Sequence, residues 1–351
     1  MKLKIITLHS IYNPGSAWQA YGLQEFLAKN GHDVEIIDYR PYYSTIGKNK
    51  LKGVIRKVLF FKNEKKLKEK YEGFINSYMF LTSKRYKSFS SLREANLEAD
   101  VFISGSDQLW NMDYDCGNDE SYYLEFTKNK RKIAYATSIG KKNIPEEELK
   151  TIVNKITGFE MISVREKSTS EILSAKMNRN VHWVCDPVFL LDVDMYKNMT
   201  KPLISGNYAV VYLSAESSLL DSIVHNIKEM LGCKIILMGG NRSRCECDIH
   251  IKDLGPIDFI SLIENAEIVI SSSFHATAFS HIFHKKFGVI LPNNNGERLQ
   301  SLLELSGLSN RIIEKESDIN RIYGEINYAD IDIAIGKFVN KSKALLLNLL
   351  K

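Results

Sequence analysis

The sequence lacks any apolar run near the length of about 20 residues that a membrane-spanning helix needs. The first apolar segment, residues 3–8, is also too short for the core of a signal peptide. The five cysteines are odd in number and scattered, which excludes a disulfide framework. Cys245 and Cys247 lie close together, but no second Cys or His pair completes a zinc site. We therefore expect a cytoplasmic globular protein without a metal.

No glycine-rich phosphate-binding motif and no repeat of a solenoid period occurs in the sequence. The apolar fraction of 44% over 351 residues is ordinary for a globular protein and favours two domains. The net charge of +5 is mild, and no nucleic-acid-binding motif accompanies it, so we expect no nucleic-acid partner.

The positive charge is concentrated between residues 48 and 70, where ten Lys or Arg stand against two Glu. Apolar residues at positions 54–55 and 58–61 lie among these cations. Two interpretations remain open. The segment is a basic interfacial helix that contacts the inner leaflet of a membrane, or it is a solvated helix that packs on its domain through an apolar stripe.

Strand and helix patterns alternate along both halves of the chain, which predicts an α/β protein with two Rossmann-like domains and parallel sheets. The strands expected in the first half are residues 2–8, 34–37, 100–104, 132–137, 161–164 and 181–184. Those expected in the second half are residues 208–213, 234–238, 268–270 and 287–290. We expect domains at 1–195, with a basic helical insertion at about 45–95, and at 205–325. A linker at 196–207 and a C-terminal helix at 326–351, which crosses back to the first domain, complete the prediction.

Ligands of doubly wound sheets bind beyond the carboxyl ends of the strands, so two such domains predict a cleft lined by these loops. One such loop contains Asp107, Gln108, Trp110 and Asn111. Carboxylates and amides bind sugar hydroxyls, and an indole covers the C–H face of a sugar ring. This loop is therefore a candidate acceptor site. The alternative is a buried loop in which Asp107 caps a helix.

Two further loops of the first half are candidates for binding an anion. Gly15 and Ser16 stand where a strand leads into a helix, and the first N–H groups of a helix attract anions; the alternative is a plain turn with a helix cap. Arg165 follows the strand at 161–164, and a guanidinium suits a phosphate or a carboxylate. The alternative is a surface pair with Glu166.

The second half offers a serine cluster, Ser272 and Ser273, followed by His275 at an expected helix start. Serine hydroxyls and helix N–H groups can hold a phosphate or carboxylate, and a histidine can act as acid or base near neutral pH. Arg298, after the next strand, is a candidate cation for binding the same anion. The alternative is a solvated residue at the start of a helix.

Five segments in this order resemble the polysaccharide pyruvyl transferase family, over about residues 4–312. They are NPGSAWQA at 13–20, GSDQLWN at 105–111, SVRE at 163–166, DPVFLL at 186–191 and SSFHAT at 272–277. The resemblance implies a GT-B-like arrangement of the two domains. It also implies phosphoenolpyruvate as co-substrate without a further cofactor, a sugar or lipid-linked oligosaccharide as acceptor, and a pyruvate ketal as product.

The resemblance also assigns roles to residues. His275 matches the catalytic histidine of the family, and Arg165 matches an arginine of its pattern. With these, Ser272, Ser273, Arg298, Gly15 and Ser16 form the expected donor site. Many members have arginine at the position of Ser273, so Arg298 or Lys285 would have to supply that charge. The alternatives are a nucleotide-sugar glycosyltransferase of the same architecture and a non-catalytic carbohydrate-binding protein.

Overall fold

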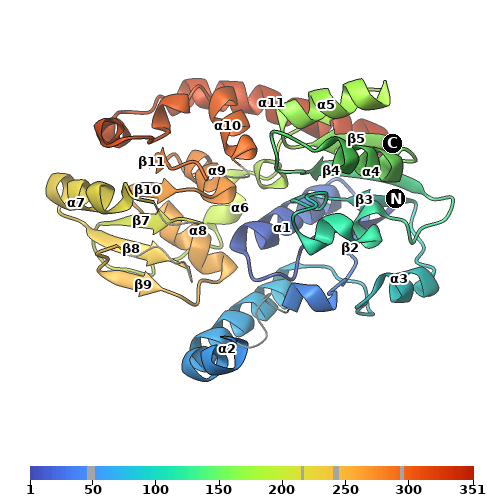
Figure 1. Ribbon diagram of the computed structural model, residues 1–351, viewed down its shortest axis with the longest axis horizontal. Helices are drawn as coiled ribbons and strands as arrows, with labels where there is room; N and C mark the ends of the chain where they lie inside the picture. Colours follow the sequence, from blue (N-terminus) through green and yellow to red (C-terminus); the bar gives the residue numbers. More distant parts are fainter. Residues whose placement is uncertain (46–51, 215–216, 240–244, 293–295) are drawn as a thin grey trace. The chain divides into compact units, whose positions relative to one another are not determined.

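The computed structural model describes residues 1–45, 52–214, 217–239, 245–292 and 296–351. Within these ranges it describes the side chains of all residues except 44–62. The chain divides into two compact units (Figure 1). Unit 1 comprises residues 1–61, 72–191 and 338–351, and unit 2 comprises residues 62–71 and 192–337. Most of the predicted basic segment 48–70 therefore lies outside the residues whose side chains are described.

Unit 1 contains a six-stranded parallel sheet in the order β2-β1-β3-β4-β5-β6. Strand β3 is a short apolar run that is buried along its whole length, as expected for a parallel sheet covered on both faces. The strands are β1 (Lys2–Ile6), β2 (Asp33–Ile36), β3 (Val101–Ser104), β4 (Arg131–Thr137), β5 (Met161–Val164) and β6 (His182–Trp183). The helices of this part are α1 (Pro14–Lys29), α3 (Phe89–Ala95), α4 (Glu146–Ile156) and α5 (Lys167–Met177).

Unit 2 contains a five-stranded parallel sheet in the order β11-β10-β7-β8-β9. The strands are β7 (Tyr208–Tyr212), β8 (Lys234–Met238), β9 (Ile249–Ile251), β10 (Ile268–Ser271) and β11 (Lys286–Val289). Its helices are α6 (Val193–Lys197), α7 (Leu220–Leu231), α8 (Pro256–Glu264), α9 (Phe274–Ile282) and α10 (Glu297–Leu305). Two parallel-sheet α/β units confirm the predicted fold class. The edge strand β9 was not predicted, because three half-exposed residues give no apolar run.

Two long helices contribute residues to both units. In α2 (Lys52–Tyr78), residues 62–71 belong to unit 2, where Lys70 forms ion pairs with Asp253 and Asp258 at 3.1 and 2.8 Å. In α11 (Tyr328–Leu349), residues from 338 onward belong to unit 1, where the hydroxyl of Ser342 accepts a hydrogen bond from the N–H of Cys185 at 3.1 Å. The C-terminal half of the last helix is thus part of the first unit.

The long segment of unit 2 begins at residue 192, before the stretch 196–207 that we expected to be a linker. Tyr196 is fully buried, and its ring packs edge-on against Phe279 at 5.1 Å. The start of that stretch is therefore part of the core of unit 2. Among the described residues, no helix combines the length and the apolar character needed to cross a bilayer.

Candidate functional site

Each sheet has one point where the strand order reverses, and the predicted motifs follow the strands at these points. In unit 1 the reversal lies between β1 and β3, which lead into the loops that carry Ser16 and Asp107. In unit 2 it lies between β7 and β10, and β10 leads into Ser272 and His275. Ligands of open α/β sheets bind at such switch points, so both loop pairs are candidate sites.

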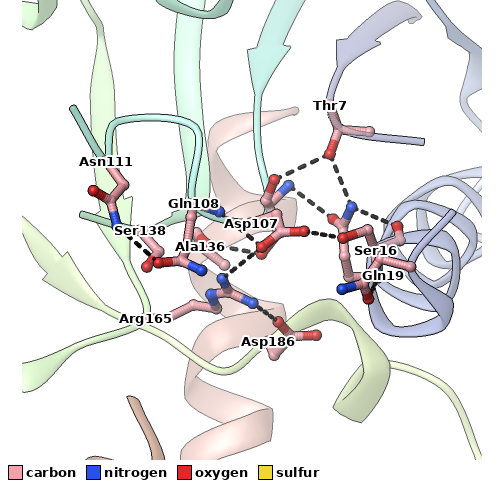
Figure 2. Close-up of polar contacts among 12 residues, drawn as sticks. Thr7, Ser16, Gln19, Asp107, Gln108, Asn111, Ala136, Ser138, Arg165 and Asp186 are labelled. Atoms are coloured by element: carbon pink, nitrogen blue, oxygen red, sulfur yellow. Dashed lines mark hydrogen bonds and ion pairs between the residues drawn. The ribbon is translucent and has the colours of Figure 1, made fainter. Parts of the chain in front are cut away.

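The switch point of unit 1 is occupied by a buried cluster of charged side chains (Figure 2). One terminal nitrogen of Arg165 donates to Asp107 Oδ1 at 3.2 Å, and the other donates to Asp186. The hydroxyl of Ser16 donates to the second oxygen of Asp107. The side chains of Arg165 and Asp186 are 1% and 0% exposed. Burial alone would lower the pKa of the Arg165 guanidinium, but the two carboxylates raise it above its ordinary value, so the arginine stays charged.

The backbone around Asp107 has an unusual conformation that fixes this cluster. Asp107 has a φ of 86°, in the left-handed region that few non-glycine residues adopt. Gly105 has a φ of 134°, and a Cβ there would lie 2.1 Å from the carbonyl oxygen of Tyr135. The side-chain amide of Gln19 accepts a hydrogen bond from the N–H of Ser106 at 3.1 Å and donates to Thr7 Oγ1 at 2.9 Å. The loop after β3 is thereby held against α1.

The remaining residues of the expected acceptor loop take structural positions. Asn111 Nδ2 donates to Gln108 Oε1 at 2.9 Å, and Asn111 Oδ1 accepts from the N–H of Asp113 at 3.1 Å. The indole of Trp110 is fully buried and stacks on Tyr123 at 6.0 Å with an interplanar angle of 8°. Trp110 therefore belongs to the hydrophobic core of unit 1 and presents no face to a sugar. The partly exposed Gln108 is the acceptor candidate best placed for contact with solvent.

The predicted anion-binding residues of unit 1 are also committed to internal contacts. Helix α1 begins with Pro14 and the buried Gly15, and the side chain of Asn13 caps it by accepting from the N–H of Ser16 at 3.2 Å. The hydroxyl of Ser16 and the guanidinium of Arg165 both bind Asp107. Two carboxylates already neutralise the one guanidinium, so these contacts lend no support to a donor-binding role.

Several residues of this region were missed by the sequence analysis. Asp186, the partner of Arg165, follows β6, and Glu166 accepts a hydrogen bond from Ser138 while fully buried. His9 Nε2 lies 3.1 Å from Asp38 Oδ1 just beyond β1 and β2. The signal shared by Asp186, His9 and Asp38 is a polar residue within three positions of the end of a strand. This rule, if applied to every strand end, would have found Asp186 and the His9–Asp38 pair.

Asp38 is the centre of a second polar cluster in unit 1. Arg40 Nε and Arg85 Nε donate to its two carboxylate oxygens at 2.6 and 2.8 Å. Burial alone would raise the pKa of Asp38, but the hydrogen bonds from His9, Arg85 and Arg40 hold it well below its usual range. The carboxylate therefore stays ionised at neutral pH and fixes the loops after β1 and β2.

In unit 2 the serine–histidine motif forms the start of α9, and His275 lies in the first turn of this helix. Ser273 is the N-cap, and its hydroxyl accepts from the N–H of Ala276 at 3.4 Å. His275 is 5% exposed, and its ring meets Phe274 edge-on at 5.2 Å. The guanidinium carbon of Arg298 lies 5.9 Å from the ring centre of Phe274. A cation, an imidazole and a helix N-terminus thus lie around one aromatic ring.

Lys285, the other cation considered for this site, is directed elsewhere. Its ammonium donates to the carbonyl oxygen of Glu264 at 2.9 Å, and burial lowers its pKa. His281 is buried within α9, with its Nδ1 2.8 Å from the carbonyl oxygen of Thr277 and its Nε2 3.1 Å from Ser306 Oγ. Arg298 is therefore the cation that the structure brings to the motif.

A pocket of about 560 Å³ opens at the switch point of the second sheet. The hydroxyl of Ser272, which lines it, accepts from the N–H of Ser214 at 2.7 Å and so links the ends of β7 and β10. Four serines, one glutamate and seven aliphatic residues line the described part of its wall: Leu213, Ser214, Ser217, Ser218, Leu219, Ser272, Ile290, Leu291, Pro292, Ile312, Ile313 and Glu314. Unlike the filled switch point of unit 1, this one has room for a ligand.

The part of the chain that the structure describes contains no group of three or more His, Cys, Asp or Glu side chains arranged to hold a metal ion. Cys245 and Cys247, the close pair in the sequence, pack against the hydrophobic core of unit 2.

Comparisons with solved structures show the fold. A putative UDP-N-acetylglucosamine 2-epimerase from Listeria monocytogenes matches with a TM-score of 0.53 at 12% identity, covering 98% of this chain and 90% of that one. UDP-GlcNAc 2-epimerase from Neisseria meningitidis matches with a TM-score of 0.52 at 11% identity, covering 100% of both chains. An α-glucosyltransferase in complex with UDP and DNA matches with a TM-score of 0.51 at 10% identity, covering 99% of this chain and 95% of that one.

The search of curated proteins found no match. The family comparison is specific, however. The model of the polysaccharide pyruvyl transferases matches residues 13–294, which is most of the chain. This range includes the loops at both switch points, from Ser16 to His275. The chain belongs to the polysaccharide pyruvyl transferase family.

Proposed function

We propose that this transferase moves the pyruvyl group of phosphoenolpyruvate onto two hydroxyls of a sugar in a polysaccharide, forming a pyruvate ketal. The family match supports the reaction class. The observation that carries the choice of donor site is the arrangement in unit 2, where His275 stands in the first turn of α9 with Arg298 against the adjacent Phe274. The pocket at the same switch point is lined by Ser272.

The donor brings a phosphate and a carboxylate, so its site needs positive charge and N–H donors. In this proposal Arg298 binds one anionic group. The first turn of α9, capped by Ser273, offers its N–H groups and the positive end of its dipole to the other. Serine hydroxyls such as that of Ser272 complete the hydrogen bonding.

The reaction balances with one acid–base group. A sugar hydroxyl attacks C2 of phosphoenolpyruvate while the methylene carbon C3 gains a proton and becomes a methyl group. The C2–O bond to phosphate then breaks, and the second hydroxyl attacks C2 to close the ketal. Of the two hydroxyl protons, one ends on C3 and the other leaves with the phosphate. His275 would carry these protons, a role that typically accelerates a reaction by about 10²–10⁴.

The test measures inorganic phosphate released from phosphoenolpyruvate in the presence of candidate glycans, together with the mass of the glycan. We expect release that depends on the glycan and a mass gain of one ketal-linked pyruvate. His275→Ala should lower turnover about 100-fold or more, at an unchanged melting temperature. His225→Ala, which changes an exposed histidine of the same unit, is the matched control. Wild-type turnover in His275→Ala would remove this histidine from the mechanism.

A nucleotide sugar is the competing donor, because two of the similar structures are UDP-GlcNAc 2-epimerases. Thermal shift measurements with phosphoenolpyruvate and with UDP-GlcNAc separate the two. A ligand that binds only the folded protein at 100 times its dissociation constant adds about 2.7 kcal/mol of stability. We expect the melting temperature to rise with phosphoenolpyruvate. A rise with UDP-GlcNAc alone would favour glycosyl transfer.

We also propose that the acceptor is lipid-linked and that the basic segment 48–70 contacts an anionic membrane surface. The support is the local charge of the sequence. Co-sedimentation with vesicles of anionic and of neutral lipids tests this proposal. Binding to anionic vesicles that disappears at high salt is expected, and equal binding to both compositions would contradict it.

A further inference from the structure

Exposed aromatic side chains gather in unit 1. Among the described residues, five aromatic rings are strongly exposed, namely Tyr12, Tyr42, Tyr78, Phe80 and Tyr114, and all belong to unit 1. Large aromatic side chains are usually buried, and those left on a surface often mark a binding site. Neither the donor site proposed above nor the buried cluster around Asp107 uses these rings.

Three of the five follow neighbouring strands at the ligand-binding edge of the first sheet. Tyr42, Tyr12 and Tyr114 come after β2, β1 and β3, which are adjacent in that order. Their exposed fractions are 65%, 47% and 45%. Because these strands are adjacent and parallel, the loops that carry the three tyrosines leave the same edge of the sheet. Three rings presented by three loops suit an oligosaccharide better than a single sugar.

Hydrogen bonds join the three loops that carry these tyrosines. The hydroxyls of Tyr39 and Tyr43, on either side of the segment that contains Tyr42, both donate to Asp119 in the loop of Tyr114. In the loop of Tyr12, His9 Nε2 lies 3.1 Å from Oδ1 of Asp38, which follows β2. The three tyrosines thus stand on loops that hydrogen bonds and ion pairs hold together.

The chemistry of this surface fits a carbohydrate better than a protein. Tyrosine offers a flat apolar face for the C–H side of a sugar and a hydroxyl for its polar groups. The neighbours of Tyr114 are the exposed carboxylates of Asp113 and Asp115, which accept hydrogen bonds from hydroxyls. The ammonium of Lys87 lies 5.9 Å from the ring centre of Tyr42. Charged groups between the rings would be costly to bury in a protein interface but remain hydrated against a glycan.

We propose that Tyr12, Tyr42 and Tyr114 form a platform that binds several consecutive sugars of the polysaccharide acceptor. The proposal rests on the proposed function for the identity of the glycan as acceptor, whereas the binding itself does not require catalysis. It extends the acceptor site from the loop of Asp107 and Gln108 to three loops. It also makes the enzyme favour oligosaccharides over single sugars.

The test is affinity electrophoresis in gels that contain the surface polysaccharide of the source organism. The platform variant is Tyr12→Ser/Tyr42→Ser/Tyr114→Ser, and Tyr78→Ser/Phe80→Ser removes two exposed rings of the same unit as control. We expect the polysaccharide to retard the wild type and the control equally. The affinity of the platform variant for the polysaccharide should be lower by about tenfold or more. The variant Tyr12→Phe/Tyr42→Phe/Tyr114→Phe keeps the rings and should bind like the wild type.

Three outcomes would overturn the platform: no retardation of the wild type, equal loss in the platform and control variants, or dimerisation of the wild type that only the platform variant abolishes. Melting temperatures show whether each variant is folded, and the phenylalanine variant keeps the test valid if the serine variant unfolds. Retardation without phosphate release from phosphoenolpyruvate would reject the proposed reaction and leave the platform standing. Where transfer is active, the KM for the glycan should rise in the platform variant while the KM for phosphoenolpyruvate stays unchanged.

Discussion

The sharpest prediction concerns Arg165, whose side chain is 1% exposed and binds two carboxylates. Arg165→Met keeps most of the apolar volume and removes the charge. The carboxylates of Asp107 and Asp186 then remain buried without their counter-ion. Because an unpaired buried charge has lost its water and gained no partner, breaking such a pair costs about 3–5 kcal/mol.

That cost is large against the 5–15 kcal/mol that stabilise an ordinary domain. For a unit of this size, each kcal/mol lowers the melting temperature by about 2–4 °C, so we expect a fall of about 6–20 °C. Lys176→Met provides the control, because it breaks a pair with Glu146 in the same unit whose side chains are 37% and 57% exposed. An exposed pair is worth about 1 kcal/mol or less.

Urea denaturation followed by tryptophan fluorescence measures the effect, since Trp18, Trp110 and Trp183 all lie in unit 1. Adding Asp107→Asn and Asp186→Asn to Arg165→Met should recover part of the loss, because the two carboxylates that Arg165 binds are then replaced by neutral amides. If Arg165→Met is no more destabilising than Lys176→Met, the reasoning is wrong. A donor-binding arginine would instead leave the unfolding free energy unchanged and abolish the thermal shift by phosphoenolpyruvate.

Three other predictions test the remaining features. Burial lowers the pKa of His281 to about 4 in the folded protein, against about 6.5 in the unfolded chain. As the pH falls, the unfolded chain is therefore protonated first, and we expect the unfolding free energy to fall by about 2 kcal/mol between pH 7 and 5. The variant His281→Gln should show a smaller fall. Hydrogen bonds hold the pKa of Asp38 below its value in the unfolded chain, which is about 3.9. The difference in unfolding free energy between the wild type and Asp38→Asn should therefore be constant from pH 7 to about 5 and should shrink in stronger acid. Gly105→Ala places a Cβ 2.1 Å from a carbonyl oxygen. The control is Gly206→Ala, because φ is also positive there but a Cβ would meet nothing within 4 Å. Gly105→Ala should lower the unfolding free energy by at least about 1 kcal/mol more than the control, and equal denaturation midpoints would contradict this.

The elements of the fold were predictable where apolar runs are bounded by turns. The strands β5 and β8 begin and end as expected at residues 161–164 and 234–238, because each is a short buried run that polar residues or glycine follow. The alternation of such runs with helices then implied parallel sheets. The carboxyl ends of these strands follow from chain direction alone, which is why the motifs were expected just beyond the strand ends.

The partners of the candidate residues were not predictable, because they depend on tertiary contacts. Arg165 binds Asp107 and Asp186, which lie 58 and 21 positions away, and Ser16 binds Asp107 across 91 positions. A local pattern cannot show that a guanidinium is already neutralised. The position of Trp110 was open for another reason: an irregular loop has no periodicity, so nothing in the sequence tells its buried from its exposed side chains.

These contacts separate the roles of the two switch points. In unit 1 the polar residues at the strand ends bind one another, so the guanidinium of Arg165 is already neutralised and the hydrogen-bonding groups are used in fixing loops. A small anion such as phosphoenolpyruvate gains little there, because it would have to displace a buried carboxylate from Arg165. In unit 2 the corresponding strand ends border a pocket of about 560 Å³, with His275 and Arg298 on the adjacent helices. In the reaction that we propose, the donor therefore binds in unit 2, and unit 1 binds the polysaccharide through the tyrosines that its fixed loops expose.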